Sequence, residues 1–123
     1  MKISQSEMKI MRLIWNSTEP LTAAQLMEQL PQEGWKPTTL LTFLSRLEEK
    51  GFVTISKRRR QNTYSARVTE QQYKTMETRA FLEQIHGGST ASLLSALCDA
   101  QPLTPEEAQE LRRWFDQQGG EEK

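Results

Sequence analysis

Hydroxyl and cationic side chains that can bind phosphates and base edges are concentrated between residues 36 and 60. Thr38, Thr42 and Arg46 are spaced four residues apart and Thr39 lies three residues before Thr42, a spacing that places them on one side of an α-helix. Threonine hydroxyls bond phosphates or bases, arginine reaches phosphate or guanine, and Leu41 between them can contact a thymine methyl group. These residues predict a helix face that reads DNA, and the alternative is a merely solvated face.

A second cationic group follows, in which Arg58, Arg59 and Arg60 are consecutive and Lys57 precedes them. Lys36 lies just before the threonine-rich stretch and adds a further cation to the surface expected to bind phosphate. Arginines beside a reading helix neutralise phosphates on the neighbouring backbone or minor groove and release counterions. The alternative is a charge run that only aids solubility.

Groups for catalysis or metal binding are scarce. The chain has one cysteine, Cys98, and one histidine, His86, so one chain cannot assemble a Cys/His metal cluster. His86 lies at an expected helix C-terminus, where capping and the helix dipole account for it. Cys98 lies on an apolar helix and is expected to be a small core residue. We therefore expect no enzyme, no metal and no cofactor.

The helices that must position these groups begin at recognisable signals. A Ser or Thr followed three residues later by Glu or Gln satisfies two backbone donors reciprocally and marks a helix N-terminus. Pro31 is expected to end the second helix, and the glycines after His86 to end the fourth. Four such pairs occur: Ser4 with Glu7, Thr22 with Gln25, Thr69 with Gln72, and Thr104 with Glu107.

The reading stretch itself is predicted to be a helix from Thr38 to Lys50. Its buried face follows from the helical spacing of four apolar residues, which are Leu40, Phe43, Leu44 and Leu47. Residues 52–56 and 62–68 are β-prone and flank a polar segment, which predicts a hairpin with the three arginines at its tip. Three helices followed by a basic hairpin form the winged helix-turn-helix plan, in which two helices brace a third for the major groove.

The two halves of the chain differ in charge. Residues 1–68 hold 11 Lys and Arg against 6 Asp and Glu, a net charge of +5, whereas residues 69–123 hold 5 against 10, a net charge of −5. A basic half attracts phosphate, and an acidic amphipathic half suits a protein partner. We expect a mainly α protein with a small β-hairpin, composed of a winged-helix DNA-binding domain in residues 1–68 and a three-helix dimerisation region in residues 69–123.

The second half carries more apolar side chains than such short helices can bury alone, which favours burial between two chains. The alternative is that these helices fold back on their own winged domain. The side chains expected at the dimer interface are Tyr73, Met76, Phe81, Leu82, Ile85, Leu93, Leu94, Leu97, Leu111, Trp114 and Phe115.

The composition of the chain indicates the cellular compartment in which the protein is expected. The 123 residues have a mean hydropathy of −0.70, and no apolar run approaches the ~20 residues that span a bilayer. The start of the chain lacks the apolar stretch of a secretory signal. We expect a cytoplasmic protein with no membrane insertion.

Residues 35–52, which read WKPTTLLTFLSRLEEKGF, resemble the recognition-helix segment of the penicillinase and methicillin-resistance repressors and their copper-responsive relatives. Residues 7–15 and 81–93 resemble the same family, so that the resemblance covers nearly the whole chain. It implies a homodimeric transcriptional repressor that binds palindromic operators through its winged domain and dimerises through its C-terminal helices. The operator contacts of the family fall on Thr38, Thr39, Leu41, Thr42 and Arg46, with the hairpin adding residues 58–60.

The resemblance also bears on how repression ends. In the antibiotic-responsive members, a membrane sensor-protease triggers cleavage at an Asn–Phe bond in the helix after the Gly-Gly pair. The corresponding bond here is Ala96–Leu97, which lacks the Asn–Phe pair. The implied inducer is a cell-wall antibiotic or another stress. Copper-responsive members carry paired cysteines near the C-terminus, and this chain has only Cys98, so we expect no copper site.

Two other functions compete with a repressor. A winged-helix adaptor would use Leu41 and the hairpin to dock on a protein, and its binding to DNA would not depend on sequence. An enzyme built around His86 or Cys98 would lose activity when either is substituted, and no nucleophile–base pair supports it.

Overall fold

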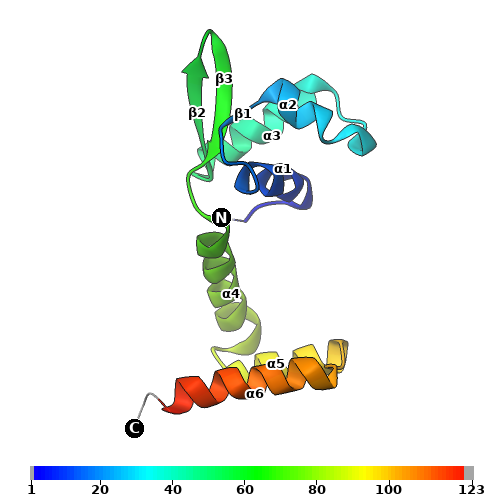
Figure 1. The fold of residues 1–123 in the computed structure, drawn as a ribbon, viewed down its shortest axis with the longest axis vertical. Helices are drawn as coiled ribbons and strands as arrows, with labels where there is room; N and C mark the ends of the chain where they lie inside the picture. Colours follow the sequence, from blue (N-terminus) through cyan, green and yellow to red (C-terminus); the bar gives the residue numbers. More distant parts are fainter. Residues whose placement is uncertain (1, 121–123) are drawn as a thin grey trace. The chain divides into compact units, whose positions relative to one another are not determined.

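The computed structural model describes residues 2–120, which form a first compact unit ending at Glu77 and a second beginning at Thr78. The first unit contains α1 (Gln5–Trp15), β1 (Leu21–Thr22), α2 (Ala23–Glu28), a 3-10 turn (Pro31–Glu33), α3 (Pro37–Glu49), β2 (Val53–Arg58), β3 (Gln61–Ala66) and the start of α4 (Figure 1). α4 spans Glu70–His86 and continues into the second unit, which adds α5 (Thr90–Ala100) and α6 (Pro105–Gly120).

All four predicted capping boxes are present. Ser4 Oγ accepts a hydrogen bond from the Glu7 backbone N–H at 3.2 Å, and Glu7 Oε1 accepts one from the Ser4 N–H at 2.8 Å. The same reciprocal pair begins the other three helices, at Thr22 and Gln25, Thr69 and Gln72, and Thr104 and Glu107. Local hydrogen bonding therefore fixes where these helices begin.

The core of the first unit lies between α1, α2 and α3. Ile10 and Met11 of α1 and Leu26 of α2 are completely buried. They belong to one apolar cluster with the inner face of α3, where Leu40, Leu44 and Leu47 are buried as predicted. Phe43 is only partly buried; it packs at the edge of this cluster, and its ring centroid lies 5.0 Å from that of Trp35. The apolar stripe of α3 thus fixes which side of the helix faces outward.

The predicted hairpin is present as β2 and β3, and it belongs to a three-stranded antiparallel sheet in the order β1-β3-β2. The two-residue strand β1, in which Leu21 pairs with Tyr64, was not predicted, because so short a segment has no periodicity. Arg58, predicted at the tip of the hairpin, lies instead at the end of β2, because it pairs with Gln61 and leaves only Arg59 and Arg60 as the loop. We call this hairpin, residues 53–66, the wing. Helices α1–α3 followed by the wing form the predicted winged helix-turn-helix.

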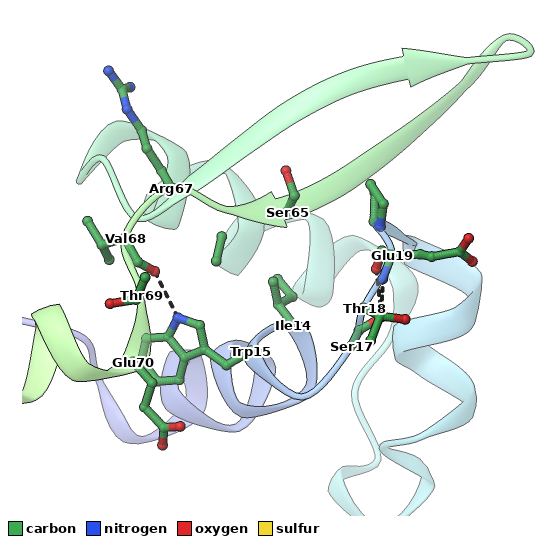
Figure 2. A pocket seen from close by; sticks show the side chains of 12 residues that line it. Ile14, Trp15, Ser17, Thr18, Glu19, Ser65, Arg67, Val68, Thr69 and Glu70 are labelled. Carbon is green, nitrogen blue, oxygen red and sulfur yellow. Dashed lines mark hydrogen bonds between the residues drawn. The ribbon is translucent and has the colours of Figure 1, made fainter.

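The first unit extends beyond the boundary expected after Val68. Tyr73 of α4 is buried, its hydroxyl accepts a hydrogen bond from the Ile3 N–H at 3.0 Å, and its ring lies 5.4 Å from that of Phe52. The Trp15 indole N–H donates to the Val68 carbonyl at 3.0 Å (Figure 2). The expectation that Tyr73 belongs to a dimer interface is therefore wrong, because its side chain completes the core of the first unit.

A buried ion pair joins the start of α1 to the end of α3. The Glu7 carboxylate is 1% exposed and accepts hydrogen bonds from Lys50 Nζ at 2.7 Å and from the Ser4 N–H. Lys50 Nζ also donates to the Lys2 carbonyl. Burial alone would raise the pKa of Glu7, but the bonds from Lys50 and Ser4 and the charge of Lys50 outweigh it and hold the pKa below its usual value. The pair ties the C-terminus of α3 to the scaffold.

We expect Glu7→Gln to lower the free energy of unfolding by about 2 kcal/mol at neutral pH, because it leaves the Lys50 ammonium partly buried without its counter-charge. Glutamine still accepts from the Ser4 N–H, so the capping box remains. Since the folded pKa is lowered, the carboxylate stabilises the fold above its unfolded pKa, and this stabilisation is lost as the pH falls through the folded pKa. Urea unfolding should therefore show the two proteins converging in acid. A difference that stays constant with pH would contradict the assigned role of the charge.

Candidate nucleic-acid interface

The outer side of α3 is polar and exposed as the sequence predicts. Thr38, Leu41, Thr42 and Arg46 are exposed together with Ser45, and Thr39 is partly buried. Leu41 keeps 44% of its surface exposed, although the leucines on the opposite side of the helix are buried. We call the exposed side chains of residues 38, 41, 42, 45 and 46 the reading face. An exposed leucine among hydroxyls suits a surface of mixed apolar and polar chemistry, such as the base edges of a major groove.

The N-terminal end of α3 is held without a side-chain cap. Lys36 occupies the N-cap position and makes no side-chain capping bond, and Pro37 occupies the first turn. The Lys36 carbonyl accepts from the N–H groups of Thr39 and Leu40, and the side chain of Lys36 is exposed. The positive end of the helix dipole and a lysine therefore lie together at the start of the reading face, which favours an anion there.

One hydrogen bond within α3 fixes the orientation of the Thr42 hydroxyl on the reading face. The Thr42 hydroxyl donates to the Thr38 carbonyl at 3.0 Å, one turn earlier in α3. Because the hydroxyl hydrogen is committed to the backbone, the oxygen lone pairs remain to accept from a base amino group or a backbone donor. Thr42 thus presents an acceptor beside the apolar surface of Leu41.

The cations expected to bind phosphate carry no internal counter-charge. In residues 2–120 the ion pairs are Lys9–Glu33, Lys50–Glu7 and Lys74–Glu70. None of them involves the expected phosphate-binding cations, all of which are exposed: Lys36, Arg46, Lys57, Arg58, Arg59 and Arg60. Positive charges without partners on one small unit attract a polyanion and gain from displacing its counterions.

The wing borders the start of α2, a contact that the sequence did not reveal. Arg58 and Arg59 line a recess together with Glu19, Thr22 and Gln25. The capping box predicted a helix at Thr22, but the pairing of β1 with β3 is what places that helix beside the wing. The polar surface around the arginines therefore includes Thr22 and Gln25, which the sequence alone does not place there.

The structure places His86 at the end of α4 and Cys98 on α5. His86 ends α4 as expected, its Nδ1 lies 2.8 Å from the Ser92 hydroxyl, and its ring lies 5.3 Å from that of Phe81. Cys98 is exposed on α5, which contradicts the expectation of a core residue. Among the residues described, no group of three or more His, Cys, Asp and Glu side chains could hold a metal ion. Over the same residues, none of the helices has the length and apolar character to cross a bilayer.

The second unit has apolar surface but no core. None of its described side chains is fully buried, and Phe81, Ile85 and Trp114 are 46%, 64% and 52% exposed. α5 and α6 form an apolar groove of about 580 Å³, edged by Glu107 and Glu110. The other residues expected at a dimer interface, apart from Tyr73, are also exposed or only partly buried: Met76, Leu82, Leu93, Leu94, Leu97, Leu111 and Phe115. The Ala96–Leu97 bond lies inside α5, with both side chains exposed.

The chain is similar over most of its length to one known family and to individual proteins. The family described as penicillinase repressor matches residues 3–117. The methicillin resistance regulatory protein MecI of Staphylococcus aureus is 29% identical over 112 residues, which cover 90% of each chain. The penicillinase repressor of Bacillus licheniformis is 28% identical over 110 residues, which cover 89% of this chain and 86% of that protein. Among solved structures, ZitR of Lactococcus lactis gives a TM-score of 0.48 at 20% identity and covers all of this chain and 77% of its own.

Both the family match and these relatives extend over the reading helix, the wing and most of the C-terminal helices. The prediction that the chain is not an enzyme is confirmed, because the proteins of this family are transcriptional repressors. The chain belongs to the penicillinase repressor family of DNA-binding transcriptional repressors.

Proposed function

We propose that this chain represses transcription as a homodimer that binds a palindromic operator, with the reading face of each α3 in the major groove. The observation that carries the proposal is the pairing of an exposed polar face on α3 with six cations that lack carboxylate partners within residues 2–120. α3 supplies base contacts through Thr38, Leu41, Thr42 and Arg46, and Thr39 adds a hydroxyl at the edge. Lys36, Lys57 and the three arginines of the wing supply phosphate contacts.

The homodimer is proposed from the second unit. A segment of about 46 residues in which no described side chain is buried lacks the core that an independently stable fold requires. Association of two copies through Phe81, Ile85 and Trp114 would remove that apolar surface from water. A two-fold dimer then sets two reading helices one or more DNA turns apart, at ~34 Å per turn, which selects a palindrome.

We also propose that induction acts on residues 69–123. The relatives named for methicillin resistance and for penicillinase repression support a signal linked to a cell-wall antibiotic or another stress. In the proposed pathway, a membrane sensor-protease leads to cleavage at Ala96–Leu97. Because that bond lies within α5, the helix must unwind locally before a protease can bind the segment in an extended form.

The central test is a gel-shift against the DNA upstream of the gene for this protein, because many repressors control themselves. We expect sequence-dependent binding, and sedimentation of the complex should give two chains per duplex. Five phosphate contacts would give a slope near −4 or −5 for log affinity against log salt concentration. Binding that changes little with salt or sequence would instead favour the winged-helix adaptor.

Arg46→Ala should weaken binding to the operator by about 1–3 kcal/mol. A loss confined to the operator identifies a base contact, whereas an equal loss on unrelated duplex with a shallower salt slope identifies a phosphate contact. Arg12→Ala is the matched control, since Arg12 is an exposed arginine on α1, outside the reading face and the wing. Titration with both duplexes over a range of salt measures each effect. Unchanged affinity of the Arg46 variant would remove that residue from the interface.

Ile85→Glu should weaken dimerisation by about tenfold or more, because it places a carboxylate within the apolar surface proposed to be buried between chains. Gln84→Glu adds the same charge at the neighbouring exposed position of α4 and should leave association unchanged. Equilibrium sedimentation measures both dissociation constants. Equal dissociation constants for the wild type and Ile85→Glu would exclude this face of α4 from the interface.

A further inference from the structure

Three consecutive residues near the start of the chain, Lys2, Ile3 and Ser4, join three helices of the first unit, and we call them the strap. The Lys2 carbonyl accepts a hydrogen bond at 2.9 Å from Lys50 Nζ at the end of α3. The Ile3 N–H donates at 3.0 Å to the Tyr73 hydroxyl of α4, and Ser4 caps the N-terminus of α1. The strap therefore connects the reading helix, the first helix and the helix that continues into the second unit.

α4 is anchored in the core of the first unit by one side chain. Of the 17 residues of α4, all of which the structure describes, only Tyr73 is buried. Its ring packs on those of Phe52 and Trp15, with 5.4 Å and 5.9 Å between the ring centroids, and its hydroxyl meets the strap. Apolar packing is non-directional, whereas a hydrogen bond requires a short distance and a restricted angle. The bond to the strap therefore adds an angular restraint at the point where α4 is held.

The same strap residues hold the end of the reading helix. Lys50 is the C-cap residue of α3, and its ammonium group donates both to the Lys2 carbonyl and to the Glu7 carboxylate. The bond between Ile3 and Tyr73 is buried, so its loss would leave the Ile3 N–H without a partner, which is costly. The end of α3 and the base of α4 are thus fixed to two adjacent residues of the strap.

A small change of angle at Tyr73 becomes large at the far end of α4. From Tyr73 to His86, where α4 ends, the helix is ~20 Å long at ~1.5 Å per residue. A tilt of ~10° at Tyr73 therefore displaces that end by ~3.5 Å. One base pair adds ~3.4 Å along the DNA axis and ~35° of rotation about it. The restraint at Tyr73 thus acts on the scale that separates one half-site spacing from the next.

We propose that Tyr73 is a positioning residue that, through its bond to the strap, sets the direction of α4 from the first unit and so restricts the half-site spacing that the homodimer accepts. The inference deepens the proposed function and rests on it. The reading face selects the bases of each half-site, and Tyr73 makes no contact with DNA. Its effect is confined to duplexes with two half-sites, because linkage raises affinity only where the geometry lets both sites engage.

The test uses the full-length protein and half-sites selected from randomised duplex. One duplex carries a single half-site, and the others carry a pair at the selected spacing or with one base pair inserted or deleted. We expect the wild type to bind the altered spacings about tenfold more weakly than the selected one. Equal binding to all spacings, with the pair still bound more tightly than the single half-site, would overturn the inference alone. Failure to bind a pair more tightly than a single half-site would overturn the proposed homodimeric repressor as well.

Two variants remove the bond between the strap and α4 from opposite sides. Tyr73→Phe deletes the acceptor and keeps the ring, and Ile3→Pro deletes the donor. We expect both to bind the single half-site as the wild type does, and the difference between spacings to fall to about threefold or less. A lower Tm is expected even if the bond only stabilises the fold, so the spacing profile is the deciding measurement.

Tyr64→Phe is the matched control, because Tyr64 is the other tyrosine of the chain and is buried in the same core. It should keep the spacing profile of the wild type. An unchanged profile in either strap variant, or an equal loss of affinity on every duplex, would overturn the positioning role and leave the proposed repressor intact. A flattened profile in Tyr64→Phe would also overturn it, because the effect would then follow from any weakening of the core.

Discussion

The burial of one leucine stripe on α3 determines most of what the first unit can do. Leu40, Leu44 and Leu47 are almost fully enclosed by α1, α2 and the sheet, so rotation of α3 about its axis would expose them to water. Each fully buried leucine contributes about 1.5–3 kcal/mol through removal from water. The orientation of the outer face is therefore fixed by the core and needs no contact of its own. Glu7 and Lys50 add a fixed point at the C-terminal end of the same helix.

Features set by neighbouring residues in the chain could be predicted, whereas features set by distant residues could not. The capping boxes and the buried leucines of α3 each depend on a few neighbouring positions, and they are found where the sequence places them. The arginine tip is found in part, because Arg59 and Arg60 form the loop whereas Arg58 lies on β2. The pairing of β1 with β3 and the packing of Tyr73 on Phe52 join segments that are far apart in sequence. Nothing in their local pattern marks those partners. The same limit applies to Cys98, whose exposure depends on what lies beside α5.

The left-handed conformation of Arg59 and Arg60 belongs to a third class of feature. The residue types were visible in the sequence, but the register of the hairpin decides whether they occupy strand positions or the loop. A shift of one residue would move one arginine onto a strand and relieve its backbone. The pairing of Arg58 with Gln61 therefore determines that Arg59 and Arg60 form the two-residue loop at the tip of the wing.

The end of the first unit within α4 has a consequence for how DNA would be released. Tyr73 and the capping box at Thr69 belong to the first unit, so damage confined to α5 or α6 leaves that unit with its core complete. In the proposed homodimer, a severed chain would keep the affinity of a single site for DNA and would lose only avidity, which is the gain in affinity that comes from linkage to a second DNA-binding unit. Derepression would then need no unfolding of the DNA-binding surface, and the clipped fragments would remain weak, non-cooperative competitors for the same half-sites.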